Sequence, residues 1–119
     1  MAARKPEEVH DLFTKFFNAG DLDALVSLYE NDAVLTPQPG QVVKGAAGIR
    51  DALSNFLSVK GKFTMQLERA IEAEGVALLI SKWTLSGGAV ELAGTTSDVV
   101  RRQADGTWLV AIDNPYGTA

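Results

Sequence analysis

Two carboxyl groups late in the sequence, Asp98 and Asp113, have the residue type and spacing for acid–base chemistry. They flank the dipeptide Asp105-Gly106, which favours a two-residue hairpin turn. Such a turn sets Asp98 directly opposite Asp113, with both side chains on one face and their Cβ atoms about 4.5–5.5 Å apart. Two carboxyls this close in apolar surroundings would share a proton, because like charge and desolvation each raise a pKa. They would form a general acid and base pair.

The residues in phase with these acids predict an apolar sheet face. They are Val90, Leu92, Val100, Leu109 and Ala111. A turn at Gly87-Gly88 would add Trp83 opposite Leu92 and place Ala77 opposite Asp98. The two acids are therefore expected in a pocket rather than on a solvated surface.

Other interpretations of the same residues stay open. The run Asp113-Asn114-Pro115 is also a common turn signal. A β-bulge would shift the register by one residue and put the two acids on opposite faces. His10, the single histidine, lies at the edge of a helical stripe, and we expect it to face solvent. With one histidine and no cysteine, no metal site is predicted.

The elements that must hold these residues divide into a helical first half and a strand-rich second half, which is typical of an α+β fold. Helical spacing of apolar residues covers 9–17, 22–29 and 46–57. Two short strands are expected at 33–35 and 41–44. An antiparallel meander with short glycine-bearing turns is then expected at 63–71, 76–85, 90–102 and 108–113.

Composition narrows the class of protein. The 119 residues suit a single domain, 1–119. Eleven basic and 15 acidic residues give a net charge of −4, which disfavours nucleic acid and anionic membranes as partners. The longest apolar run, 76–80, is too short to cross a bilayer. We see no export signal and expect a cytoplasmic protein.

The other face of the meander is mixed in polarity. It carries Lys82, Thr84, Glu91, Thr95, Ser97, Val99 and Arg101, with Leu78 and Ile80. This composition suits a homodimer interface, and a solvated sheet face is the alternative.

Four strings of the sequence are distinctive: GDLDAL at 20–25, YENDAV at 29–34, SDVVRR at 97–102 and DGTW at 105–108. With these strings, the order of the elements resembles the NTF2-like superfamily. The sequence most resembles its SnoaL-like, ketosteroid-isomerase-like branch and the small SgcJ/EcaC-type proteins in it. The resemblance implies a cone-shaped fold with three N-terminal helices packed on a curved, mostly antiparallel sheet. It also implies an apolar cavity, a homodimer through the outer sheet face, and no cofactor.

Asp98 occupies the position of the isomerase's oxyanion-hole aspartic acid in this resemblance. The isomerase's tyrosine falls at Phe13, and its catalytic base falls near Pro37, where no carboxylate stands. Thr96 stands where limonene epoxide hydrolase has an arginine. The resemblance therefore implies chemistry other than these two reactions.

We predict a small-molecule pocket protein, a cofactor-independent acid/base enzyme of isomerase or cyclase type that acts on a hydrophobic ring-bearing, polyketide- or steroid-like substrate. Asp98 would donate a proton or hydrogen bond to a carbonyl oxygen, and Asp113 would take a proton from the adjacent carbon. The substrate-binding residues would be Phe13, Phe16, Trp83, Leu92, Ala111 and Tyr116. The alternatives are a non-catalytic protein that binds a hydrophobic ligand and a dimeric adaptor of the same fold.

Overall fold

Three helices and six strands make up the described part of the chain. The structure is a computed structural model that describes residues 2–117; residues 1 and 118–119 of the predicted domain lie outside it. The helices are α1 (Glu8–Asn18), α2 (Leu22–Val26) and α3 (Gly45–Ser58). The strands are β1 (Tyr29–Gln38), β2 (Gln41–Lys44), β3 (Lys62–Ala73), β4 (Val76–Ser86), β5 (Leu92–Arg102) and β6 (Trp108–Asp113).

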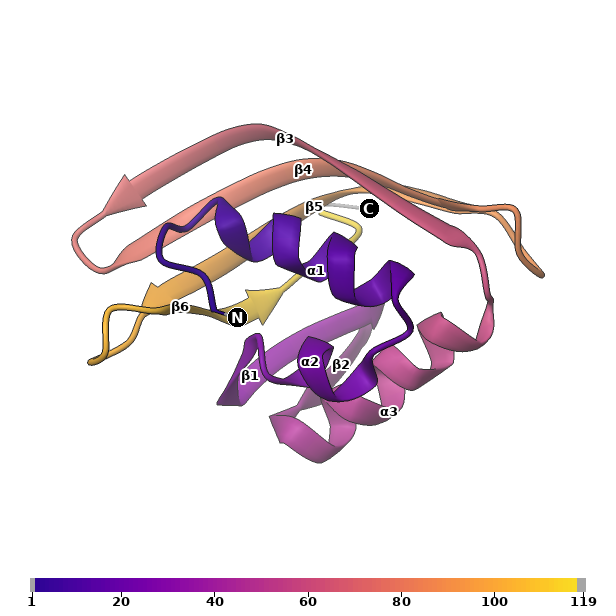
Figure 1. Cartoon of the computed structure of the whole chain (residues 1–119), viewed down its shortest axis with the longest axis horizontal. Coiled ribbons are helices and arrows are strands. Elements are labelled where there is room, and N and C mark those ends of the chain that lie inside the picture. Colours follow the sequence, from indigo (N-terminus) through magenta and orange to yellow (C-terminus); the bar gives the residue numbers. More distant parts are fainter. Residues whose placement is uncertain (1, 118–119) are drawn as a thin grey trace.

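The strands form one curved sheet in the order β2-β1-β6-β5-β4-β3. Neighbouring strands are antiparallel, except that β1 runs parallel to β6. The long strands arch over α1, and all three helices lie on the concave side of the sheet (Figure 1). The predicted α+β architecture, with three N-terminal helices on a curved, mostly antiparallel sheet, is confirmed.

The helices pack through the apolar residues that predicted them. Helix α1 buries Val9, Leu12 and Phe17 against the sheet. The side chain of Asp21 caps α2 by accepting a hydrogen bond from the Ala24 N–H at 3.1 Å. None of the described helices has the length and apolar character needed to cross a membrane.

The connection between β4 and β5 is longer than predicted. It spans residues 87–91, and the Ala89 N–H donates to the Val59 carbonyl at the end of α3. The predicted pairs are therefore wrong: Leu79, not Ala77, lies opposite Asp98. The difference is an even number of residues, so Asp98 still faces the concave side.

The β5–β6 hairpin departs from prediction twice, and the departures offset each other. Its loop has three residues, since the Gln103 N–H donates to the Thr107 carbonyl at 2.7 Å and Gly106 takes a φ of +85°. A bulge at Ala111 then adds one residue to β6, because Val100 pairs with Val110 and Val99 with Ile112. The longer loop alone would turn Asp113 outward, and the bulge turns it back to the concave face.

Candidate functional site

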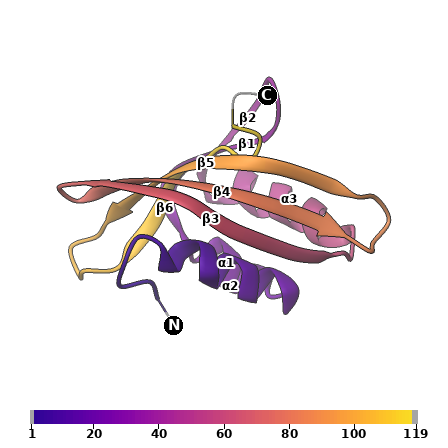
Figure 2. The ribbon, with the colours of Figure 1, turned by 90° about the horizontal axis from the view of Figure 1, so that it is seen from above.

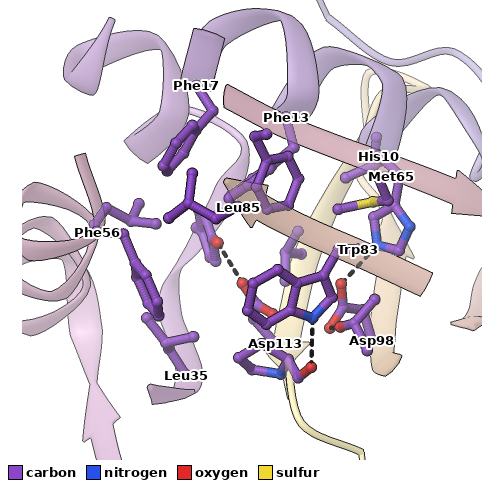
Figure 3. A pocket seen from close by; sticks show the side chains of 17 residues that line it. His10, Phe13, Phe17, Leu35, Phe56, Met65, Trp83, Leu85, Asp98 and Asp113 are labelled. Carbon is purple, nitrogen blue, oxygen red and sulfur yellow. Dashed lines mark hydrogen bonds and ion pairs between the residues drawn. The ribbon is translucent and has the colours of Figure 1, made fainter. Parts of the chain in front are cut away.

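A largely apolar cavity lies between the concave face of the sheet, α1 and α3 (Figure 3). Its volume is about 40 Å³. Aromatic rings form much of the wall: the centroids of Phe13 and Phe63 lie 5.3 Å apart, and Phe63 stacks on Trp83 at 5.8 Å. The polar residues of the lining are His10, Tyr29, Thr96, Asp98 and Asp113. All four titratable side chains among them are buried.

Asp98 and His10 form a buried pair that joins β5 to α1. His10 Nε2 lies 2.6 Å from Asp98 Oδ2, and the two residues are 5% and 4% exposed. His10 Nδ1 lies 2.8 Å from the hydroxyl of Ser81, which is fully buried on β4. A hydroxyl can donate to neutral imidazole and accept from imidazolium, so Ser81 suits either charge state of His10.

The surroundings of Asp98 favour its ionised form. Asp98 Oδ1 accepts hydrogen bonds from Thr96 Oγ1 at 2.6 Å and from the Asn114 N–H at 2.9 Å. Burial by itself raises the pKa of Asp98, but the hydrogen bond and charge of His10, with hydrogen bonds from Asp113 and Thr96, bring the pKa below its usual value. Because a carboxylate only accepts, His10 Nε2 carries the proton between them.

Asp113 lies beside Asp98, but its surroundings shift its pKa in the opposite direction. Tyr29 donates its phenolic hydrogen to Asp113 Oδ2 at 2.5 Å. Burial raises the pKa of Asp113 well above its usual value, and the negative charge of Asp98 and a hydrogen bond with it add to the rise. Burial also raises the pKa of Tyr29. Any negative charge on Asp113 would raise that pKa further, so the phenol keeps its proton. The surroundings thus favour the protonated form of Asp113 and the ionised form of Asp98.

The structure brings half of the predicted site residues together around the cavity. Phe13, Trp83, Asp98 and Asp113 line it. The other four predicted positions do not: Phe16, Leu92, Ala111 and Tyr116.

The structure explains why each of these four side chains lies outside the cavity lining. Phe17, rather than Phe16, shares the cavity-facing side of α1 with Phe13. Ala111 is the buried bulge residue of β6. Leu92 and Tyr116 line a separate groove outside the cavity.

Sequence reasoning missed two residues of the site. His10, predicted to face solvent, is buried. The side of α1 that carries it packs against the sheet, where His10 contacts Asp98 and Ser81. Tyr29, interpreted as the end of a helix, opens β1 and reaches Asp113 from there. The sequence signal for both was a polar-tipped residue at the margin of an apolar stripe.

The titratable residues do not gather into a metal-binding group. Among residues 2–117, no three His, Cys, Asp or Glu side chains lie close enough together to hold a metal ion. The four titratable side chains described above can transfer protons and form hydrogen bonds.

Comparison with known proteins places this geometry in a family. A family model described as a SnoaL-like domain matches residues 9–111. The fold matches an NTF2-like protein of unknown function from Shewanella oneidensis, with 18% identity over 90% of this chain and 92% of that one and a TM-score of 0.78. It also matches a conserved protein from Planctomyces limnophilus, with 25% identity, 90% and 88% coverage, and a TM-score of 0.76.

A candidate dehydratase of the NTF2-like family from Streptomyces avermitilis is a third structural match, with 13% identity over 90% of this chain and 89% of that one and a TM-score of 0.73. No curated protein sequence matches the chain. The identities to the Shewanella and Streptomyces proteins are low enough that those likenesses show the fold alone. The family model spans most of the chain and includes His10, Tyr29 and Asp98. The chain belongs to the SnoaL-like family of the NTF2-like superfamily.

Proposed function

We propose that this protein is a cofactor-independent acid/base enzyme that acts on a neutral, hydrophobic, ring-bearing small molecule. One observation carries the proposal: two buried carboxyl groups, Asp98 and Asp113, lie side by side at the polar end of an otherwise apolar cavity, in surroundings that lower the pKa of the first and raise the pKa of the second. That arrangement favours proton transfer at a carbon beside a carbonyl. It also suits elimination of water, in which the carboxylate takes a proton from that carbon, a C=C bond forms, and the hydroxyl of the next carbon leaves as water with the proton of the carboxylic acid.

The pKa directions support a role for each acid, the reverse of the roles predicted from sequence. Asp113 would donate its proton or a hydrogen bond to the substrate oxygen, since its pKa is raised. Asp98, whose pKa is lowered, would accept the proton from carbon. His10 is a positioning residue that holds the Asp98 carboxyl through a hydrogen bond, and Tyr29 fixes the orientation of the Asp113 carboxyl.

The size of the cavity limits how a substrate binds. A volume of about 40 Å³ has room for water, so a ring must displace side chains of the lining. Phe13, Phe56 and Met65 line the cavity and are only half-buried. We expect these three to move when a substrate enters.

Deuterium exchange at the carbon beside the carbonyl of 2-tetralone tests the proposal. In D₂O, the protein should accelerate this exchange above the buffer rate, as followed by proton NMR. Asp113→Asn keeps the shape but cannot transfer a proton, and it should lower the accelerated rate about 10²–10³-fold. Asp32→Asn, at an exposed position on β1, is the matched control and should leave the rate unchanged.

A non-catalytic carrier is the second candidate, because an apolar cavity alone is enough to bind a hydrophobic ligand. A carrier would bind 2-tetralone without accelerating exchange. Equal rates for the unchanged protein, Asp113→Asn and buffer would rule out the acid/base proposal for this ketone class and favour the carrier.

A further inference from the structure

An outer groove of about 730 Å³ lies beside the inner cavity. It runs between α3, the β1–β2 hairpin and the segment that follows β6. Thr36 on β1 holds that segment by donating to Asn114 Oδ1 at 2.8 Å, and both regions meet at one end of the molecule (Figure 2). The groove is far larger than the cavity it adjoins.

Aromatic side chains lie at the boundary between the groove and the cavity. Phe56 lines both spaces, and Figure 3 shows its ring on the α3 side of the cavity. Tyr116 lines the groove and contacts Trp83 of the cavity edge-on, with ring centroids 5.6 Å apart. Phe56 is half-buried on a helix surface, so a change of its rotamer would join the two spaces.

The polar groups of the groove define what could lie in it. They include the amides of Gln38, Gln41 and Asn55 and the carboxylate of Asp51. Among the described residues that line the groove there is no lysine, arginine or histidine. A phosphate or carboxylate would find no charge partner there and would meet Asp51, whereas hydroxyl or amine groups would find hydrogen-bond partners.

We infer that the outer groove is a second binding subsite, which takes a hydrogen-bonding tail without negative charge on a ligand whose apolar ring enters the cavity past Phe56. The inference rests on the proposed function, since it places the reacting end of the ligand in the inner cavity. It adds the class of substrate: a two-part molecule with an apolar ring and a hydroxylated or amine-bearing chain.

Four probes test the subsite: phenol, which has no tail, and 6-phenylhexan-1-ol, 6-phenylhexylamine and 6-phenylhexanoic acid. Binding is measured by calorimetry. The alcohol and the amine should bind more tightly than phenol, and the acid should bind more weakly than the alcohol. Asp51→Asn should weaken binding of the amine by about two- to fivefold, as expected for an exposed ion pair. It should leave binding of the alcohol unchanged.

Filling the groove gives the sharper comparison. Asn55 and Ser54 are neighbouring exposed residues of α3, and only Asn55 lines the groove. Asn55→Trp should weaken binding of the alcohol and of the amine by about tenfold or more, while binding of phenol stays the same. Ser54→Trp is the matched control and should change none of the three.

Three results would overturn the inference: equal effects of Asn55→Trp and Ser54→Trp, binding of the acid as tight as that of the alcohol, or no binding of any tailed probe. None of these results bears on the acid/base proposal, which the deuterium exchange of 2-tetralone tests separately. Conversely, tail binding in a protein without exchange activity would support the subsite in a carrier.

Discussion

Asp98 and Asp113 occupy one buried site but hold their protons differently, because their partners differ in charge. Asp98 faces a histidine that can carry positive charge, together with several hydrogen-bond donors. Asp113 faces a phenol that stays neutral and the carboxylate of Asp98. Desolvation alone would raise both pKa values, so the neighbours decide which acid ionises.

The raised pKa of Asp113 predicts that folding stability falls as the pH rises above the unfolded carboxyl pKa of about 3.9. In that window the folded state holds a proton that the unfolded state has lost, so the free energy of unfolding decreases by up to about 1.4 kcal/mol per pH unit until the folded pKa is passed. Asp113→Asn cannot lose a proton and should flatten this decline. Urea unfolding at a series of pH values measures it.

Asp98 acts on this pH dependence in two ways. Its own lowered pKa contributes stability that is present above the unfolded pKa and lost as the pH falls through the folded pKa. Its negative charge also raises the pKa of Asp113, so Asp98→Asn should shorten the decline above pH 4 without abolishing it, because Asp113 stays buried. A decline that is unchanged in Asp113→Asn would contradict the assignment of the neutral acid.

Tyr29→Phe is predicted to raise the pKa of Asp113 further, because the hydrogen bond from Tyr29 lowers it. The variant should also lose about 1–3 kcal/mol of stability, since Asp113 Oδ2 loses its buried partner. Carboxyl ¹³C NMR across a pH titration measures the first effect, and urea unfolding the second. Tyr116→Phe, in the outer groove, should change neither.

Asp98 was predictable from sequence because alternation along β5 assigns its face without knowledge of distant residues. His10 and Tyr29 were not. A buried polar residue at the edge of a helical stripe has the same spacing as an exposed one, and only the partner distinguishes them. The partner of His10 is Asp98, 88 residues away.

At the scale of elements, the segment after β6 is part of the site. The Trp83 indole N–H donates to the Pro115 carbonyl at 2.6 Å, and the Asn114 N–H donates to Asp98. This segment passes directly over Gly94, where an added Cβ would lie 2.9 Å from the Pro115 carbonyl oxygen. Because Gly94 has no side chain, the segment can pass close enough to β5 to reach Asp98.

Gly94→Ala is predicted to displace this segment and to destabilise the fold by about 1–3 kcal/mol, as overpacking does. Gly48→Ala on α3 is the matched control. Its Cβ would lie 3.4 Å from Val43 Cβ, an ordinary contact, so the change should be neutral or raise stability by up to about 1 kcal/mol. Thermal unfolding compares the two, and equal midpoints would contradict the prediction.

Most elements follow from local patterns, but their exact pairing does not. The predicted strand 108–113 matches β6 in full, because turn residues mark both its ends. The bulge at Ala111 has no such mark. It arises where β6 must pair with β5 on one side and with parallel β1 on the other, which is a long-range condition. The longer loop and the bulge were both missed, and their effects on the register cancel. Asp113 therefore faces the predicted side of the sheet, although the predicted two-residue turn was wrong.

At the scale of the whole molecule, the convex sheet face carries an apolar row across four strands. Ile71 pairs with Leu78, Leu78 with Val99, and Val99 with Ile112. Ile71 and Ile112, at the two ends of the row, are 46% and 43% exposed. We propose that this row is the centre of a homodimer interface, which agrees with the dimer expected from sequence.

Ile112→Lys is predicted to convert the dimer to a monomer, because a charge at the centre of an apolar interface would be buried without a partner. Sedimentation equilibrium at micromolar concentrations measures the change. Val42→Lys, at an apolar position on β2 that is 66% exposed, is the control and should stay dimeric. A monomeric unchanged protein would contradict the proposal.

The origin of the site in distant parts of the chain has a consequence for how the protein matures. The contacts of His10 with Asp98 and of Tyr29 with Asp113 span 88 and 84 residues, and such long loops close late during folding. A nascent or half-folded chain therefore lacks both contacts. The raised pKa of Asp113 also depends on the joining of β6, the strand that carries it, to the sheet beside Asp98, so a partly folded chain has no assembled site.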